Sequence, residues 1–356
     1  MLVLSNDDVD RVLTMQDCIG ALEAMYADFA AGRALVSTRV DNLAPNAMPG
    51  AYYAFKHMGG TWPAKGVQAL RINSDVIMHP LVAGKPRRVK QPLAGGRWVG
   101  LVFLFSTETG ALLAILPDGV MQRIRVGAAN GIALDRLARP DVSTLALIGS
   151  GWQAGAQLEA ALAMRAFREV RVYSPRREHR EAFAAEALER HGARVRIAAV
   201  DTAEACVAGA DVIMAATSSV VRVIELAWLR RGMHVSCIKA QEVDGEVLDA
   251  CDRVFVHTLE QAKQIDNVMK DTPNVVPEHG WWNDGSRDFG AYPDLGRLIV
   301  SPAPARRNPE EITCFVNNVG SGLQFAAAGA LVLERARRAG LGHELPDEWF
   351  SEDVHP

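Results

Sequence analysis

The sequence predicts an α/β protein in which a Rossmann-type doubly wound domain is combined with a domain of α+β type. Continuous apolar strands alternate with helices from about residue 143 onward, which is typical of a parallel sheet with both faces covered. A glycine-rich turn separates the first of these strands from its helix. The chain of 356 residues is also long for one compact domain, so two domains are expected.

Composition narrows the class of protein further. The net charge of -4, with no dominant basic block, argues against nucleic-acid binding. Five scattered cysteines show no metal-site spacing and fit free thiols in a reducing cytoplasm. The first residues are acidic, and no apolar run approaches the roughly 18 residues that cross a bilayer. We therefore expect a soluble, cytoplasmic protein without a metal and without a membrane segment.

The first part of the chain combines a helix with a β-rich stretch. Apolar residues at helical spacing predict a helix over 7–32 that ends at Gly32. Strands are predicted over 51–58, 66–77, 98–106 and 111–117, with a hairpin turn at 106–110. Residues 79–97 are rich in proline, glycine and positive charge and predict an exposed loop, either solvated or acting as a lid over an anion.

From residue 122 the pattern changes. An alanine-rich helix over 122–137 precedes the alternating region, whose strands are predicted over 143–149, 169–174, 194–200, 211–217, 233–238 and 253–258. A last helix is expected from near Pro309 to Gly340, packed on the first domain. We expect residues 123–305 to form the Rossmann domain, and residues 1–122 and 306–356 to form the other one.

The turn after the first strand of this region is the strongest local signal. Its motif is GxGxxA, formed by Gly149, Gly151, Trp152, Gln153 and Ala154 with Ser150 between the glycines. The first glycine permits a tight turn and the second allows a pyrophosphate to approach the backbone. The small third residue lets helix pack on strand, and the helix N-terminus attracts phosphate. The motif predicts a dinucleotide site.

The end of the second strand indicates which dinucleotide. NAD(H) sites place a carboxylate about 20 residues after the glycines, to bind the ribose hydroxyls. Here Ser174, Arg176 and Arg177 stand instead, and a hydroxyl with guanidinium groups suits a 2′-phosphate. NADP(H) is therefore favoured, with NAD(H) possible. Alternatively, both arginines are solvated and Ser174 only caps a helix.

Several segments, taken in order, resemble the ornithine cyclodeaminase/mu-crystallin family. They are Ser37-Thr38-Arg39, Met48-Pro49, the helix carrying Arg125, the GxGxQA turn, and the run from Glu310 to Thr313. The resemblance spans about residues 2–342. It implies a homodimer formed through the first domain, a substrate site between the domains, and chemistry at the α-carbon of an amino or imino acid.

The resemblance also assigns roles to particular residues. Arg39 and Arg125 match the two arginines that hold the substrate carboxylate. Thr217 and Ser218 match a polar pair near the cofactor, and Asn318 falls where the family has a serine near the nicotinamide. The family's catalytic residues are expected on a strand near residue 68 and in a loop near residue 241.

At both of those places the chain departs from the family pattern. Gln68 stands where the family's lysine is expected, so Lys56 is the candidate proton donor, and Arg71 is a second cation nearby. Gln241 stands at the position of the cyclodeaminase aspartate and cannot act as a base. Glu242 or Asp244 could replace it only in a rebuilt loop.

Three functions are compatible with these residues. The first is an NADP(H)-dependent oxidoreductase acting on the C–N bond of a small amino or imino acid, as an imine reductase or amino acid dehydrogenase. The second is a redox-neutral lyase that releases ammonia, and the third is a crystallin-like protein that binds NADPH without catalysis. The sequence does not identify the substrate, nor the role of Trp281 and Trp282.

Overall fold

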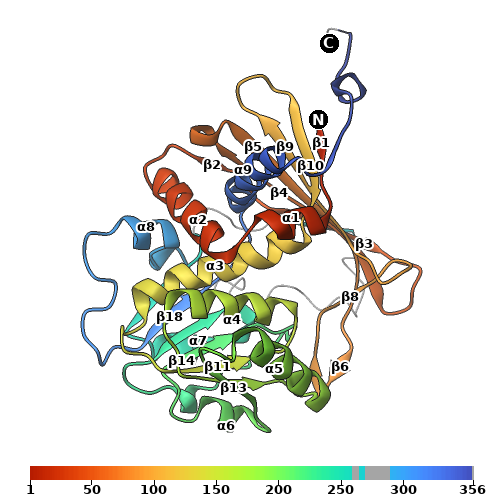
Figure 1. Ribbon diagram of the computed structural model, residues 1–356. Helices are drawn as coiled ribbons and strands as arrows, with labels where there is room; N and C mark the ends of the chain where they lie inside the picture. The colour runs from red at the N-terminus through yellow and green to blue at the C-terminus, as the bar shows by residue number, and fades with distance from the viewer. Residues whose placement is uncertain (259–263, 269–288, 355–356) are drawn as a thin grey trace.

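The computed structural model describes residues 1–258, 264–268 and 289–354. These residues form two sheets with their helices, one half stacked on the other (Figure 1). Helix α3 (Gly119–Leu137) runs between the halves and contacts α2 above and α4 below. The expected combination of a doubly wound domain with an α+β unit is confirmed.

The lower half is built on a fully parallel sheet of seven strands. Its strand order is β13-β12-β11-β14-β15-β18-β16, so the order reverses between β11 and β14. In such sheets ligands bind at the carboxyl ends of the strands, at this reversal. The strands are β11 (Thr144–Ile148), β12 (Glu169–Tyr173), β13 (Arg196–Ala199), β14 (Val212–Ala215), β15 (His234–Cys237), β16 (Arg253–Val256) and β18 (Thr313–Val316).

Strand β18 corrects one expectation. The helix predicted from Pro309 begins only at Gly322, and residues Thr313–Val316 pair on both sides within the parallel sheet. All four β18 residues are buried, which is typical of a central parallel strand, and the apolar run alone did not separate strand from helix. The sheet therefore continues beyond the boundary expected at residue 305.

Helices cover both faces of the parallel sheet. They are α4 (Trp152–Met164), α5 (Arg177–His191), α6 (Ala203–Val207), α7 (Gly245–Asp249) and α8 (Leu295–Val300). None of the helices in the described residues is both long and apolar enough to span a membrane. Trp281 and Trp282 lie outside the described residues.

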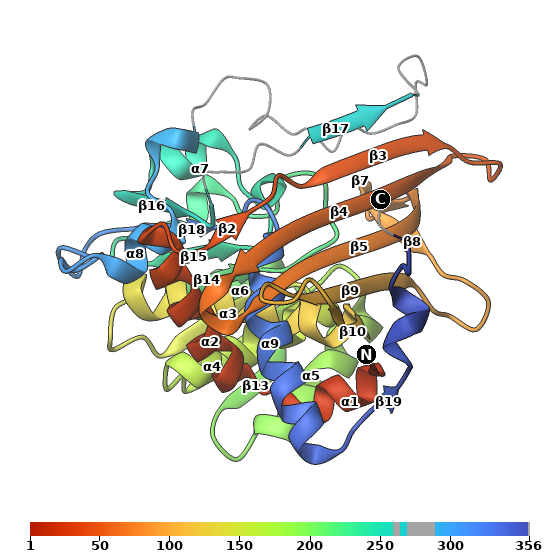
Figure 2. The same ribbon diagram turned by 90° about the horizontal axis from the view of Figure 1, so that it is seen from above.

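The upper half is a mixed sheet with helices on one face (Figure 2). Its order is β17-β3-β4-β5-β9-β10-β1-β19, with β2 and β8 pairing at the side. The long central strands alternate buried and half-buried side chains, so one face is covered and the other is not. The strands are β1 (Leu2–Val3), β2 (Leu35–Val36), β3 (Val40–Pro45), β4 (Ala51–Trp62), β5 (Val67–Met78), β8 (Val89–Gln91), β9 (Val99–Ser106), β10 (Leu112–Pro117), β17 (Gln264–Asn267) and β19 (His343–Glu344).

The N-terminal region contains two helices where one was expected over 7–32. Helix α1 (Asn6–Val12) ends at Leu13, and Thr14 caps α2 (Met15–Ala30) by accepting a hydrogen bond from the backbone N–H of Asp17. The apolar periodicity continues across the break, which hid it. Helix α9 (Gly322–Ala339) packs on α2, β4 and β5, as expected of a C-terminal helix returning to the first domain.

Residues 79–97 are not a simple exposed loop. They contain the hairpin strands β6 (Leu81–Val82) and β7 (Lys85–Pro86), followed by β8 on the edge of β5. In Figure 1 this segment descends from the upper sheet toward the lower half, beside α5. Arg87 within it is buried, with 8% of its surface exposed.

Candidate functional site

The glycine turn lies at the carboxyl end of β11, beside the point where the strand order reverses. Gly149 has a φ of 127°, and a Cβ atom there would lie 2.2 Å from the carbonyl oxygen of Ala216. Its N–H donates to the carbonyl of Tyr173 at 2.8 Å, which ties the turn to β12. Only glycine fits this conformation and this close approach. Ala154 is fully buried against the sheet, as the motif predicts.

The second half of the turn fits a dinucleotide pyrophosphate. A Cβ atom on Gly151 would meet nothing within 4 Å, so the space before α4 is open. The first N–H groups of a helix lack partners inside it and favour an anion at this place. The buried Oε1 atom of Gln153 accepts no hydrogen bond within the described part of the chain. Trp152 is half exposed, and the guanidinium of Arg123 on α3 lies 5.8 Å from its ring centroid.

The adjoining edge of β12 holds the residues expected at the adenosine ribose. Ser174 is buried, and its Oγ atom lies 2.7 Å from that of Ser150 in the glycine turn. Arg176 and Arg177 are exposed beside it, and Arg177 pairs with Glu181 at 2.7 Å. A third arginine, Arg180, is buried here.

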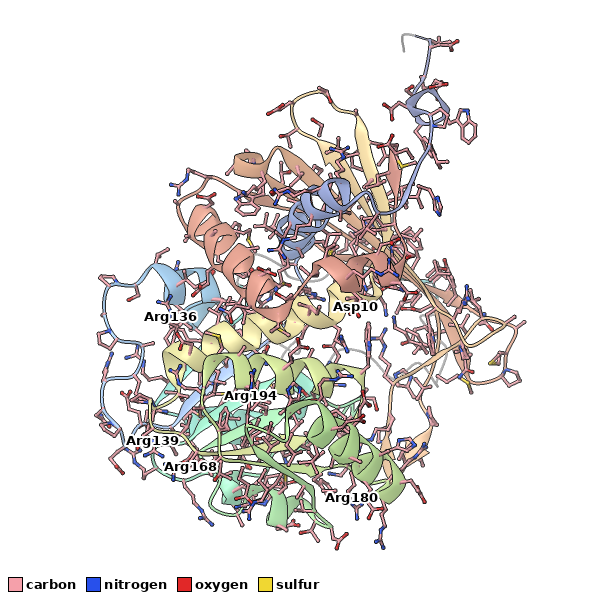
Figure 3. The ribbon with its side chains drawn as sticks, viewed as in Figure 1. Asp10, Arg136, Arg139, Arg168, Arg180 and Arg194 are labelled. Carbon is pink, nitrogen blue, oxygen red and sulfur yellow. The ribbon has the colours of Figure 1, made fainter. Side chains whose placement is uncertain are left out.

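Arg180 is a residue that the sequence did not single out. It donates to the carbonyl of Ser174 at 3.2 Å and to the carboxylate of Asp201 at 2.6 Å. Figure 3 shows it on α5 in the lower half. These two bonds fix the end of β12 and so the position of the Ser174 hydroxyl.

The carboxylate of Glu242 binds the backbone just after two further strands, β14 and β15. It lies in the short 3-10 helix η3 (Ala240–Glu242) and is fully buried. One carboxylate oxygen accepts from the N–H of Thr217 at 2.6 Å and the other from the N–H of Ile238 at 2.9 Å. Burial raises the pKa of this carboxyl, while both N–H donors counteract the rise. Asp244 caps α7 instead, through the N–H of Val247.

We expect removal of this carboxylate to destabilise the lower half. Glu242→Ala leaves two buried backbone N–H groups without acceptors, which should lower the free energy of unfolding by about 2 to 4 kcal/mol. Glu242→Gln keeps one oxygen acceptor and should cost clearly less. Urea unfolding of the three proteins measures this difference, and equal stability of all three would contradict the role.

Asn318 is engaged with the loop that follows β16. Its side-chain oxygen accepts from the N–H groups of His257 and Thr258 at 3.1 and 3.3 Å, and its amide donates to the Thr258 carbonyl at 3.0 Å. His257 is buried and bonds the carbonyl of Val319 through Nδ1 at 2.6 Å. A carbonyl only accepts, so Nδ1 carries the proton and Nε2 accepts from the hydroxyl of Tyr26.

The covered face of the upper sheet carries a row of polar residues. Asp41, Lys56 and Asn73 are directly opposite one another on β3, β4 and β5, so their side chains share one face. Arg71 and Asp75 flank Asn73 on the same face of β5. A Cβ atom on Gly100 would lie 2.1 Å from Asp118, so this glycine makes room for the carboxylate that binds Arg71.

Lys56 lies within this row in a buried charge cluster. Its Nζ atom is 3.7 Å from the carboxylate of Asp75, whose other oxygen is 2.9 Å from Nζ of Lys90. Lys56 is 2% exposed. Burial lowers the pKa of Lys90 and raises the pKa of Asp75.

Arg125 is a buried charge on α3. It is 4% exposed, and its guanidinium donates to the amide oxygens of Gln122 and Gln324 at 2.6 and 2.7 Å. Among the described residues no carboxylate is paired with it. Burial lowers the pKa of Arg125 to about 9, with Arg71 as the second cause, and it stays a cation at neutral pH. Burying a cation without a counter-ion is costly, and a ligand carboxylate would offset this cost.

Arg39 and Arg71 lie close enough to Arg125 for their positive charges to lower its pKa. Arg39 forms a bidentate ion pair with Asp41, in which its guanidinium donates to the two carboxylate oxygens at 2.7 and 2.8 Å. Arg71 and Arg125 both lie over the ring of Phe325, with guanidinium carbons 5.6 and 5.1 Å from its centroid. The structure thus brings together the two arginines expected from the resemblance and adds a third.

Gln68 is on the other face of β5, away from this cluster. Its side chain bonds the hydroxyl of Thr61 and the carbonyl of Ala69. On this strand Gln68 therefore faces away from the arginine cluster, and its match to the family's lysine stays a prediction. The cation that β5 does present is Arg71, three residues later. The polar alternation of Arg71, Asn73 and Asp75 in the sequence was the signal that could have shown it.

The segment 317–321 joins the two halves of the site. It leads from β18 of the lower sheet into α9, and Gly322 lies against Gly59 of β4, where a Cβ atom would be 2.2 Å from backbone. A Cβ atom on Gly320 would lie 3.2 Å from the guanidinium of Arg125. The arginine cluster therefore adjoins the carboxyl ends of the parallel strands.

Comparisons with known proteins agree with this architecture. The sequence profile of the ornithine cyclodeaminase/mu-crystallin family matches residues 1–340. An alanine dehydrogenase of Archaeoglobus fulgidus is 28% identical over 97% of this chain and 98% of its own length. A Delta(1)-pyrroline-2-carboxylate reductase of Bacillus cereus is 26% identical over 97% of this chain and 99% of its own. The structure of the Thermococcus litoralis Delta(1)-pyrroline-2-carboxylate reductase with NADH and L-proline has a TM-score of 0.77 at 23% identity, covering 97% of this chain and 100% of that one.

Proposed function

Because the chain belongs to the ornithine cyclodeaminase/mu-crystallin family, we propose that it is an NAD(P)H-dependent oxidoreductase that reduces the C=N bond of a small 2-imino acid and, in reverse, oxidises the amino acid. The observation that supports this best is Arg125, a buried cation with no carboxylate partner among the described residues, next to Gly320 in the segment that leads from the parallel sheet into α9. Relatives named as an alanine dehydrogenase and as pyrroline carboxylate reductases support the same chemistry.

In this proposal the arginines bind and orient the substrate. The planar guanidinium of Arg125 binds the substrate carboxylate through two hydrogen bonds. Arg39 binds the same carboxylate when the substrate displaces Asp41 from it. Arg71 adds positive charge but remains tied to Asp118, at 2.6 Å. Fixing the carboxylate in this way fixes the α-carbon, which lowers the entropic barrier to reaction.

Residues of the lower half would hold the cofactor. The open end of α4 at Gly151 takes the pyrophosphate, and Thr217, Ser218 and Asn318 flank the carboxyl ends of neighbouring strands. When bound, a reduced nicotinamide supplies a hydride to the imine carbon. The imine nitrogen must gain a proton as well, and Nζ of Lys56, held by Asp75, is the proposed donor.

We propose NADP(H) as the preferred form of the cofactor. No carboxylate stands at the end of β12, where NAD(H) sites place one. The buried hydroxyl of Ser174 and the exposed guanidinium groups of Arg176 and Arg177 suit a 2′-phosphate. Arg177 is free to turn toward a phosphate because its pair with Glu181 is solvent-exposed and therefore weak.

We also propose that the chain divides near residues 122 and 305 into two domains, and that β18 belongs to the Rossmann domain.

We further propose a homodimer that forms through the upper sheet. The uncovered face of β4, β5 and β9 carries apolar side chains such as Phe55, Ile72 and Phe103, which are only half buried in one protomer. An apolar face of this size is unusual on an isolated sheet, and a second copy would cover it.

Absorbance at 340 nm tests the reaction type. The protein, NADPH or NADH, and a panel of 2-oxo acids with ammonia or methylamine, together with cyclic imino acids, should show one reduced cofactor consumed per amine formed. The redox-neutral lyase gives ammonia from diamino acids without net change in absorbance. No consumption with any imine would favour the non-catalytic alternative.

A further inference from the structure

The basic segment of the upper half crosses to the lower half and pairs with it. We call residues 85–88 the strap. The N–H of Arg88 donates to the carbonyl of Ser218 at 3.0 Å, and the N–H of Val220 donates to the carbonyl of Pro86 at 3.3 Å. Between these bonds Arg87 and Ser219 form an antiparallel bridge, and Nζ of Lys85 lies 3.4 Å from the carbonyl of Arg222. The strap is thus held against the loop that follows β14.

The strap brings the Arg87 side chain to the carboxyl edge of the parallel sheet. Its charge is close enough to Glu242 and Tyr173 for both to influence the pKa of Arg87, which burial lowers. Tyr173 ends β12 and Glu242 follows β15, and β11 and β14 lie between those strands. Arg87 therefore lies over the ends of β11 and β14, next to the turn that begins at Gly149.

The Arg87 guanidinium has no hydrogen bond or ion pair within the described residues, although only 8% of the residue is exposed. The charge of Glu242 favours the Arg87 cation, but the two side chains form no direct ion pair or hydrogen bond in the described part of the chain. Placing a cation in a largely buried position without a partner is costly unless a ligand supplies the opposite charge. The anion that belongs at this edge of a doubly wound sheet is phosphate.

We propose that Arg87 is a further cofactor-binding residue, supplied by the strap of the upper half, and that its guanidinium binds the pyrophosphate of the dinucleotide. The inference rests on the proposed function, since it needs a dinucleotide at the glycine turn. The helix end at Gly151 then binds the pyrophosphate from one side and Arg87 from the other. A planar guanidinium can do so through two parallel hydrogen bonds.

Calorimetric titration of NADH and of NADPH into the full chain, at fixed ionic strength, tests this. Arg87→Gln should raise both dissociation constants by the same factor, about 10- to 100-fold, because the pyrophosphate is common to both nucleotides. Arg97→Gln removes the same charge from an exposed position of the same segment and should leave both constants unchanged. Urea unfolding of each variant verifies that it is folded.

A second variant separates charge from packing. Arg87→Lys keeps the cation without the fork, so it should bind both nucleotides more weakly than the unaltered chain, but more tightly than Arg87→Gln. The dependence of affinity on salt should stay steep in Arg87→Lys and flatten in Arg87→Gln.

Unchanged affinities in Arg87→Gln would overturn the inference. A loss confined to NADPH would also overturn it, because Arg87 would then bind the 2′-phosphate. Failure of the unaltered chain to bind either nucleotide would instead overturn the proposed function, and the inference with it.

Discussion

Replacing Arg125 by alanine should lower kcat/KM by about 1000-fold with little change in cofactor affinity. The substrate carboxylate loses its main cationic partner, and the α-carbon is no longer fixed for reaction. Arg125→Lys keeps the positive charge but cannot form two parallel hydrogen bonds to a carboxylate, so it should retain an intermediate activity. Steady-state kinetics combined with cofactor titration measures both effects.

A control on the same helix is available. Arg136 lies near the other end of α3 (Figure 3), about three helical turns from Arg125, and pairs there with Glu23 at 3.1 Å. Arg136→Ala should therefore leave kcat/KM unchanged. An active Arg125→Ala variant would show that the substrate carboxylate binds elsewhere. The unfolding midpoint of each variant distinguishes a loss of activity from a loss of structure.

The second large effect concerns the choice of cofactor. Ser174→Asp combined with Arg177→Asp should weaken NADPH binding by about 100-fold and leave NADH binding unchanged or improved. Two carboxylates then face the 2′-phosphate, and the new residue at 174 can accept hydrogen bonds from ribose hydroxyls instead. Fluorescence titration with both nucleotides measures the ratio of the dissociation constants.

Arg190→Asp is the matched control for this double variant. Arg190 also lies on α5, is exposed, and pairs with a glutamate four residues away, as Arg177 does. The substitution introduces the same charge change as Arg177→Asp, near the other end of the helix, so it should affect neither nucleotide. Equal losses for NADPH and NADH in the double variant would remove the 2′-phosphate assignment.

The glycine turn and the strands around it could be predicted because their chemistry is local. Gly149 is required by its own backbone conformation and by one carbonyl contact, and the flanking strand and helix follow directly in the sequence. Buried parallel strands are continuous apolar runs, so a few consecutive residues are enough to identify them. For Thr313–Val316 the apolar run led to a wrong prediction of helix, because a short apolar run directly before a helix fits a strand or a helix equally well.

The substrate half was harder to predict because its residues meet only through tertiary contacts. Arg125 and Gln324 are 199 residues apart in the sequence, and Arg71 binds Asp118 across 47 residues. Which face of β5 is covered depends on α9, so periodicity alone did not show that Arg71 faces the site and Gln68 does not. Arg87 shows the same limit, because the basic composition of its segment does not predict that it pairs with the loop after β14.

Isotope transfer tests the central claim most directly. Reduction of an imino acid turned over by the protein, with NADPH or NADH deuterated at the transferred C4 position, should give an amino acid one mass unit heavier, with the label on the α-carbon. Mass spectrometry and NMR of the product locate the deuterium. An unlabelled product, formed while the labelled cofactor is left unchanged, would contradict hydride transfer and with it the proposed oxidoreductase.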